Sequence, residues 1–202
     1  MTQTVKILNQ IKFSDMIQTE NNTKNSIAQT EESMQLVVFE LDKEEYAVKI
    51  AELQEIITIP EVTPIPNAPA FISGILNLRG RIVVVVDLEK RFNLVREHGE
   101  VVDGNIIITE VEENNFGVIV DKVNEIITVP LSSIQAAPSL VSTKINAEYL
   151  NGVVVLKDKK TVAGKEGDQK DGSRLVILLD LHKMLQEKEL LALSKIVQKT
   201  AE

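Results

Sequence analysis

Cysteine and tryptophan are absent from the 202 residues, and aromatic residues make up only 3% of them. Without cysteine the chain cannot form disulfides, use a thiolate in catalysis or bind zinc through sulfur. So few aromatic side chains argue against a platform on which nucleic-acid bases could stack. The formal net charge of −8 argues further against binding to a phosphate backbone or docking on an anionic membrane.

Long hydrophobic runs are also lacking, because no apolar stretch approaches the ~20 residues that a membrane helix needs. Lys6, Asn9, Gln10 and Lys12 interrupt the N-terminal stretch, which therefore lacks the apolar block of a signal peptide. Charged residues make up 26% of the chain and hydrophobic residues 44%, which is typical of a soluble globular protein. The sequence predicts a cytoplasmic protein with one large domain or two small ones.

No catalytic constellation can be assembled from the sequence. The two histidines, His98 and His182, have no second ligand at metal spacing, and no G-x-S-x-G elbow is present. The acidic pairs Glu44-Glu45 and Glu112-Glu113 fall in hairpin turns, where solvated carboxylates do not form the buried pair that acid–base catalysis needs. We therefore expect no enzymatic activity and no metal site.

The most informative stretch runs from Phe71 to Leu88, FISGILNLRGRIVVVVDL. Two apolar runs flank a polar turn in which Gly80 can adopt a positive φ and reverse the chain. The β-branched run from Ile82 to Val86 predicts a strand that is covered on both faces. Arg79 then lies at the tip of a hairpin, facing water or a partner, although most Arg-Gly turns are only turns.

Two segments of the chain repeat one another. Residues 36–60 read LVVFELDKEEYAVKIAELQEIITIP, and residues 106–130 read IIITEVEENNFGVIVDKVNEIITVP, without a gap. The repeat continues as VVVVDLEKRF at 83–92 and VILLDLHKML at 176–185. In each copy an aspartate, Asp87 or Asp180, follows the apolar run and is suited to cap a short helix that begins at the next residue. The sequence thus encodes two copies of one unit.

Each unit has about five short strands, and units of this kind usually curl into small barrels that leave few unpaired edges. We expect an all-β fold of two five-stranded SH3-like barrels with short helices and a C-terminal helix. The predicted organisation is a flexible N-terminal extension (1–33), a domain (34–195) with subdomains at about 34–95 and 104–182, a helix at about 186–199 and a mobile loop at 157–173. A protein with two barrels and no catalytic groups is suited to binding other proteins.

The assembled pattern resembles the CheW family, the adaptor proteins of bacterial chemotaxis. The resemblance covers about residues 35–195 and is carried by the following stretches: Phe39, Tyr46, Glu55-Ile56-Ile57, Ala70 to Gly74, Asn77-Leu78-Arg79-Gly80, Val86-Asp87-Leu88, Gly117 to Val123, Tyr149 to Gly152 and Leu175 to Leu181. It implies two intertwined SH3-like barrels that bridge the cytoplasmic tips of chemoreceptors and the regulatory domain of the histidine kinase CheA. It also implies recruitment to membrane-associated receptor arrays, no enzymatic activity and no cofactor.

The resemblance further implies which residues act. A receptor-binding groove between the barrels would include Val37, Ile50, Leu53 and Val120. Glu55, Ser73, Gly74 and Arg79 would match positions that couple to the kinase or the receptor, although the family often has lysine where Ser73 stands. Each position also has a structural reading: the four apolar residues as core, Glu55 as a solvated strand residue and Gly74 as a bulge.

Three other functions stay open at this point. An adaptor of the same fold could serve a different receptor–kinase pathway, such as surface motility or second-messenger control. A hydrolase built on small β-barrels would need a nucleophile and base that the sequence does not supply. A nucleic-acid-binding barrel is opposed by the acidic net charge.

Overall fold

The computed structural model describes residues 31–94, 104–137, 145–157, 173–186, 188 and 190. The predicted 157–173 loop and most of the N-terminal extension and C-terminal helix lie outside these residues. The strands of the first repeat are β1 (Ser33–Leu41), β2 (Glu44–Lys49), β3 (Leu53–Thr58), β4 (Ile72–Leu78) and β5 (Arg81–Asp87). Those of the second are β6 (Asn105–Val111), β7 (Asn114–Val120), β8 (Lys122–Pro130), β9 (Ile134–Gln135), β10 (Leu150–Lys157) and β11 (Ser173–Leu179).

Within the described residues the helices are all short. The α-helices there are α3 (Leu88–Arg91) and α5 (Leu181–Leu185), and the 3-10 turns are η2 (Ile50–Glu52), η3 (Leu131–Ser133) and η4 (Ala147–Tyr149). Asp87 and Asp180 cap α3 and α5 as predicted, because each carboxylate accepts a hydrogen bond from a backbone N–H three residues on. Leu190, further along the chain, has 1% of its surface exposed.

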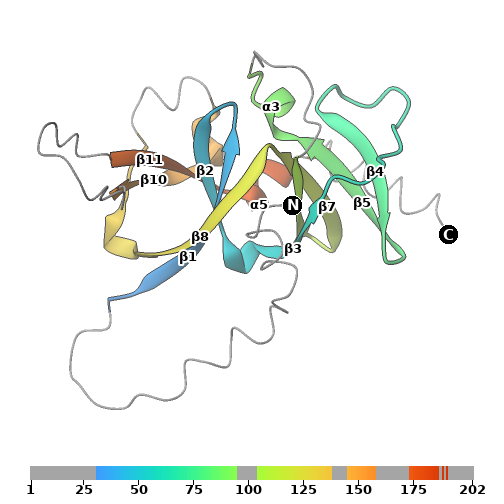
Figure 1. Ribbon diagram of the computed structural model, residues 1–202. Helices are drawn as coiled ribbons and strands as arrows, with labels where there is room; N and C mark the ends of the chain where they lie inside the picture. Colours follow the sequence, from blue (N-terminus) through green and yellow to red (C-terminus); the bar gives the residue numbers. More distant parts are fainter. Residues whose placement is uncertain are drawn as a thin grey trace, which may run out of the picture.

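The strands form two sheets, and each sheet takes strands from both repeats. Sheet A has the order β8-β1-β2-β11-β10-β9, and sheet B has the order β3-β6-β7-β5-β4. Figure 1 shows the exchange as a mixture of colours, with blue strands among yellow and red ones in sheet A. Strands of different repeats meet in four pairs: β2 with β11 and β5 with β7 are parallel, whereas β1 with β8 and β3 with β6 are antiparallel. The fold is therefore mostly β, as predicted, but the two repeats do not correspond to the two sheets.

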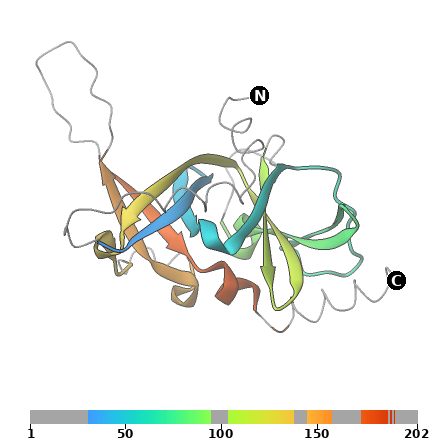
Figure 2. The same ribbon diagram turned by 90° about the horizontal axis from the view of Figure 1, so that it is seen from below.

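The described residues form three hydrophobic clusters, of which one joins the two sheets. One consists of sheet A residues alone, such as Leu36 and Val176, and another of sheet B residues alone, such as Val85 and Ile106. The third, the inter-sheet core, includes Val37, Phe39 and Val153 of sheet A, Val84, Val118 and Val120 of sheet B, and Leu181, Met184 and Leu185 of α5. Figure 2 shows α5 lying where the two sheets meet. Each sheet thus curls around its own cluster and packs its other face against the neighbouring sheet.

Strand β5 confirms the prediction of a strand covered on both faces. Its four valines, 83–86, are each exposed by 1% or less. Val83 and Val85 belong to the sheet B cluster, whereas Val84 and Val86 belong to the inter-sheet core. The period-two alternation of a strand therefore sends every valine into one of two apolar environments. This explains why the run is unbroken by polar residues.

Candidate protein-interaction site

The turn between β4 and β5 is a two-residue hairpin loop made of Arg79 and Gly80. Both residues have positive φ, 53° and 86°, a combination that matches the twist of the flanking strands. The side chain of Asn77 fixes the turn, because its Oδ1 accepts a hydrogen bond from the N–H of Gly80 at 2.8 Å. The geometry leaves 74% of the Arg79 side chain exposed. The predicted position of Arg79 at the tip of a hairpin is confirmed.

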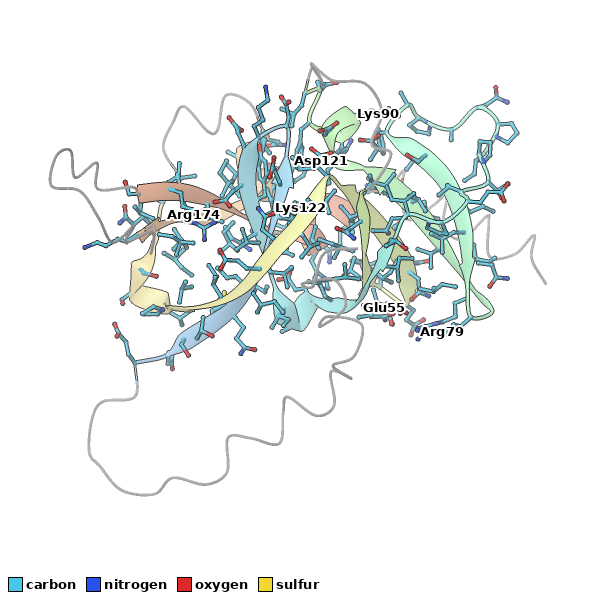
Figure 3. The ribbon with its side chains drawn as sticks, in the orientation of Figure 1. Glu55, Arg79, Lys90, Asp121, Lys122 and Arg174 are labelled. Atoms are coloured by element: carbon cyan, nitrogen blue, oxygen red, sulfur yellow. The ribbon has the colours of Figure 1, made fainter. Side chains whose placement is uncertain are left out.

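Arg79 forms an ion pair with Glu55, another predicted coupling residue. The Arg79 Nη2 and Glu55 Oε2 atoms are 3.0 Å apart, and the Glu55 side chain is 20% exposed. Figure 3 shows the two side chains meeting at the outer corner of sheet B. Glu55 lies on β3, one edge of sheet B, whereas the turn joins β5 to β4, the opposite edge. The pair therefore forms only because the sheet is curled.

Three further polar residues extend this corner. Gln54 of β3 donates from Nε2 to Glu110 Oε2 of β6 at 2.5 Å, and its Oε1 accepts from Arg81 Nη1 at 3.3 Å. We call Gln54, Glu55, Arg79, Arg81 and Glu110 the polar corner. Sequence reasoning found Glu55 and Arg79 in it but missed the other three. A signal for Arg81 existed, since it aligns with Arg174 when the second repeat is extended by two residues.

Ser73 and Gly74 lie elsewhere on β4. Gly74 is five residues before Arg79, so about 16 Å separates them along an extended strand. Its φ is 146°, and a Cβ on it would collide with the backbone carbonyl of Thr63. The register of β4 and β5 shifts between Ile72 and Gly74, as at a bulge. Gly74 therefore shapes the strand, and the structure does not bring it or the half-buried Ser73 to the polar corner.

The four predicted groove residues are in or beside the inter-sheet core. Val37 and Val120 are 0% exposed, Leu53 is 7% exposed and Ile50 is half-buried. Val37 and Val120 therefore line no surface in this structure, which corrects their placement in an open groove. The reason is that both sheets press apolar faces together, so side chains fill the space between them.

Partly exposed apolar side chains do occur at the margin of the inter-sheet core. Ile50, Ile56 and Ile126 are half-buried and pack against it. Ile56 and Ile126 were not predicted as site residues, although the repeated EIIT string marks them as equivalent positions. We call Ile50, Leu53, Ile56 and Ile126 the apolar margin.

A second charged cluster lies on sheet A. Arg174 of β11 pairs through Nη1 with Glu45 Oε1 of β2 at 2.6 Å and through Nη2 with Glu125 of β8. The hydrogen bond to Glu125, together with the charges of both carboxylates, raises the pKa of the Arg174 guanidinium above its usual value. Asn124 completes the group by donating to Glu45 Oε1 at 3.4 Å. Here one cation is shared by two anions.

Among the described residues, no group of three or more His, Asp or Glu side chains could hold a metal ion. Nor is any helix within that part of the chain long and apolar enough to cross a membrane. His182 lies on α5, half-buried, and His98 falls outside the described residues. What the structure does present is two curled, interlinked sheets with an exposed ion pair at one corner. The fold and site thus define a β-rich binding module.

Comparisons with known proteins name the family. The profile of the CheW-like domain matches residues 35–189. The chain is 35% identical to a chemotaxis protein CheW of Treponema pallidum over 173 residues, covering 84% of this chain and 92% of that protein. A CheW of Klebsiella aerogenes is 31% identical over 170 residues, covering 83% and 91%. The crystal structure of the scaffolding protein TtCheW from Thermoanaerobacter tengcongensis superimposes with a TM-score of 0.62 at 31% identity, covering 82% of this chain and 96% of that one. This chain belongs to the CheW family.

Proposed function

We propose that this chain, a non-enzymatic chemotaxis adaptor of the CheW family, couples chemoreceptors to the histidine kinase CheA through the polar corner and the apolar margin. The observation that carries the assignment of the sites is the Glu55–Arg79 ion pair, which joins two predicted coupling residues on one exposed corner. An adaptor acts by binding and by biasing the conformational equilibrium of its partner, so no catalytic group is required. Its place of action would be the cytoplasmic receptor array.

The apolar margin is the part suited to a receptor. A chemoreceptor tip is a helical hairpin, and an amphipathic helix binds by laying apolar side chains against a partly exposed apolar surface. Ile50, Ile56 and Ile126 offer such side chains at the edge of the inter-sheet core, to which the 7% exposed Leu53 belongs. Val37 and Val120 would support this surface from beneath without touching the receptor.

The polar corner is suited to selective coupling. A guanidinium carries five N–H donors, and the ion pair with Glu55 leaves donors of Arg79 directed at solvent. A partner can therefore bind Arg79 without first breaking the pair. Charges at the rim of an interface contribute mostly to partner choice and to the association rate.

The test is co-purification of the full chain with two probes from the same genome, the CheA regulatory domain and a receptor tip fragment. Arg79→Glu places two carboxylates together at the corner and is expected to weaken one partner selectively. Arg79→Lys keeps the charge and should weaken it less. Lys122→Glu makes the same charge change at an exposed position of sheet A and serves as the control.

The possible results separate the two parts of the proposal. Wild-type binding to both probes with unchanged binding of Arg79→Glu would show that the site is misassigned while the function stands. If the wild-type chain bound neither probe, the coupling function itself would be contradicted. A loss as large for Lys122→Glu as for Arg79→Glu would mean that net charge, and not the corner, decides binding.

A further inference from the structure

Arg81 carries a charge that the described residues do not neutralise. It is the first residue of β5 and is exposed. In the described part of the chain its side chain makes one hydrogen bond, from Nη1 to the amide oxygen of Gln54 at 3.3 Å, and no ion pair. An amide oxygen can orient a guanidinium but does not cancel its charge. Arg81 is therefore positioned and still cationic toward solvent.

The equivalent residue of the other sheet shows what a neutralised arginine looks like here. Arg174 stands two residues before Val176, the first buried residue of β11, as Arg81 stands two residues before Val83 of β5, and it binds the carboxylates of Glu45 and Glu125. Its side chain is only 29% exposed. The fold can thus supply two carboxylates at this position, and sheet B supplies none to Arg81.

The neighbouring groups explain why the charge stays open. Glu110 is the nearby carboxylate on β6, but its Oε2 accepts from the Gln54 amide at 2.5 Å. The amide stands between Glu110 and Arg81, with its N–H toward one and its oxygen toward the other. Glu55 is paired with Arg79. Both carboxylates of the polar corner are therefore engaged by other groups.

We propose that Arg81 is a second contact residue of the polar corner and binds a carboxylate side chain of the protein partner. The inference rests on the proposed coupling function and names the chemistry that this corner recognises. Arg79 and Arg81 flank Gly80, so two guanidiniums are presented by one turn on a chain of net charge −8. Arginine binds carboxylates through two parallel hydrogen bonds, which favours an aspartate or glutamate on the partner.

The test measures the association rate of the full chain with the receptor tip fragment and with the CheA regulatory domain at 50 and 500 mM salt. Arg81→Gln should slow association with one partner about threefold to fivefold at 50 mM, and the difference should vanish at 500 mM. Arg81→Lys should keep most of the rate because it keeps the charge. Arg81→Glu should slow association more than Arg81→Gln, and an Asp or Glu→Lys change on the partner should restore it.

The control is Arg174→Gln. Because two carboxylates already neutralise the charge of Arg174 in the wild type, this variant should leave the salt dependence of association unchanged. Wild-type rates for Arg81→Gln and Arg81→Glu with both partners, alongside a defect in Arg79→Glu, would overturn the inference and leave the proposed function standing. An equal slowing at both salt concentrations would overturn it too, because the role would not be electrostatic. If the wild-type chain binds neither partner, both proposals fall.

Discussion

Sheet A and sheet B are built from equivalent strands, yet they treat their charges differently. Strands β8, β1, β2, β11 and β10 of sheet A correspond in order to β3, β6, β7, β5 and β4 of sheet B. On sheet A, Arg174 is shared by two carboxylates of the same sheet. On sheet B, Arg81 has only an amide and Arg79 has a single carboxylate. At this equivalent position, sheet A neutralises its arginine with two carboxylates, whereas sheet B leaves its arginine exposed with an amide partner.

The largest expected effect on stability concerns two equivalent glycines, one in each sheet. Gly74 and Gly152 occupy equivalent bulges with φ of 146° and 139°. A Cβ on Gly152 would lie 2.5 Å from the carbonyl oxygen of Gln135, and one on Gly74 would lie closer still to that of Thr63. We expect Gly74→Ala to lower the free energy of unfolding by about 3 kcal/mol or more, and Gly152→Ala by slightly less.

Urea denaturation measures both changes, and Gly80→Ala is the matched control. Gly80 also has a positive φ, 86°, but a Cβ there would meet nothing within 4 Å. Gly80→Ala should therefore lower the free energy of unfolding only by the cost of the left-handed backbone conformation, about 1 kcal/mol. Normal stability of Gly74→Ala with lost partner binding would show that Gly74 acts by contact and not by shaping the strand.

The local structure was largely predictable from the sequence. The strands, the hairpin turns and the two aspartate caps follow from alternation, from β-branched runs and from residues that favour turns, all of which act over a few positions. The unbroken run of four valines in β5 correctly predicted that this strand is buried on both faces. The exchange of strands between the sheets was not deducible from these patterns. It depends on pairing between strands that are far apart in the chain, parallel for β5 with β7 and β11 with β2, and antiparallel for β1 with β8 and β3 with β6.

Dependence on contacts between distant residues also explains why the site was only partly predictable from the sequence. Glu55 and Arg79 were selected from a resemblance, but their contact depends on the curl of sheet B, which no local pattern states. Val37 and Val120 were placed in a groove because an apolar strand residue looks the same in a core and at a binding surface. Only the packing of one sheet on the other shows that they are buried. Gln54 and Glu110 gave no signal, since polar residues on strands are common.

The next prediction sharpens the contrast between the two arginines. Arg174→Gln leaves Glu45 and Glu125 facing each other without a cation and should lower the free energy of unfolding by about 1–2 kcal/mol. Arg81→Gln removes no ion pair and should change it by less than about 0.5 kcal/mol. Thermal or urea unfolding at low salt measures both. Equal losses for the two variants would break the comparison, because Arg81 would then be as much a structural residue as Arg174.

The last prediction tests a feature in which the two sheets agree. Asp180 accepts from the Lys183 N–H at 2.9 Å, and Asp87 accepts from the Lys90 N–H at 3.1 Å. Each carboxylate also pairs with the ammonium of the same lysine, at 3.3 and 3.1 Å. Asp180→Ala and Asp87→Ala should therefore each lower the free energy of unfolding by about 1 kcal/mol at pH 7.

The effect of Asp180 should also depend on pH with a definite sign. Burial acts to raise the pKa of this carboxyl, but the hydrogen bonds and charge of Lys183 outweigh it and lower the pKa below its usual value. A lowered pKa in the folded state means that the stabilisation is fully present above the unfolded pKa, about 3.9, and is lost as the pH falls through the folded value. The difference between wild type and Asp180→Ala should thus be constant from pH 7 to about 5 and shrink in stronger acid. A difference that instead grew toward low pH would mean that burial, and not Lys183, sets the charge of this cap.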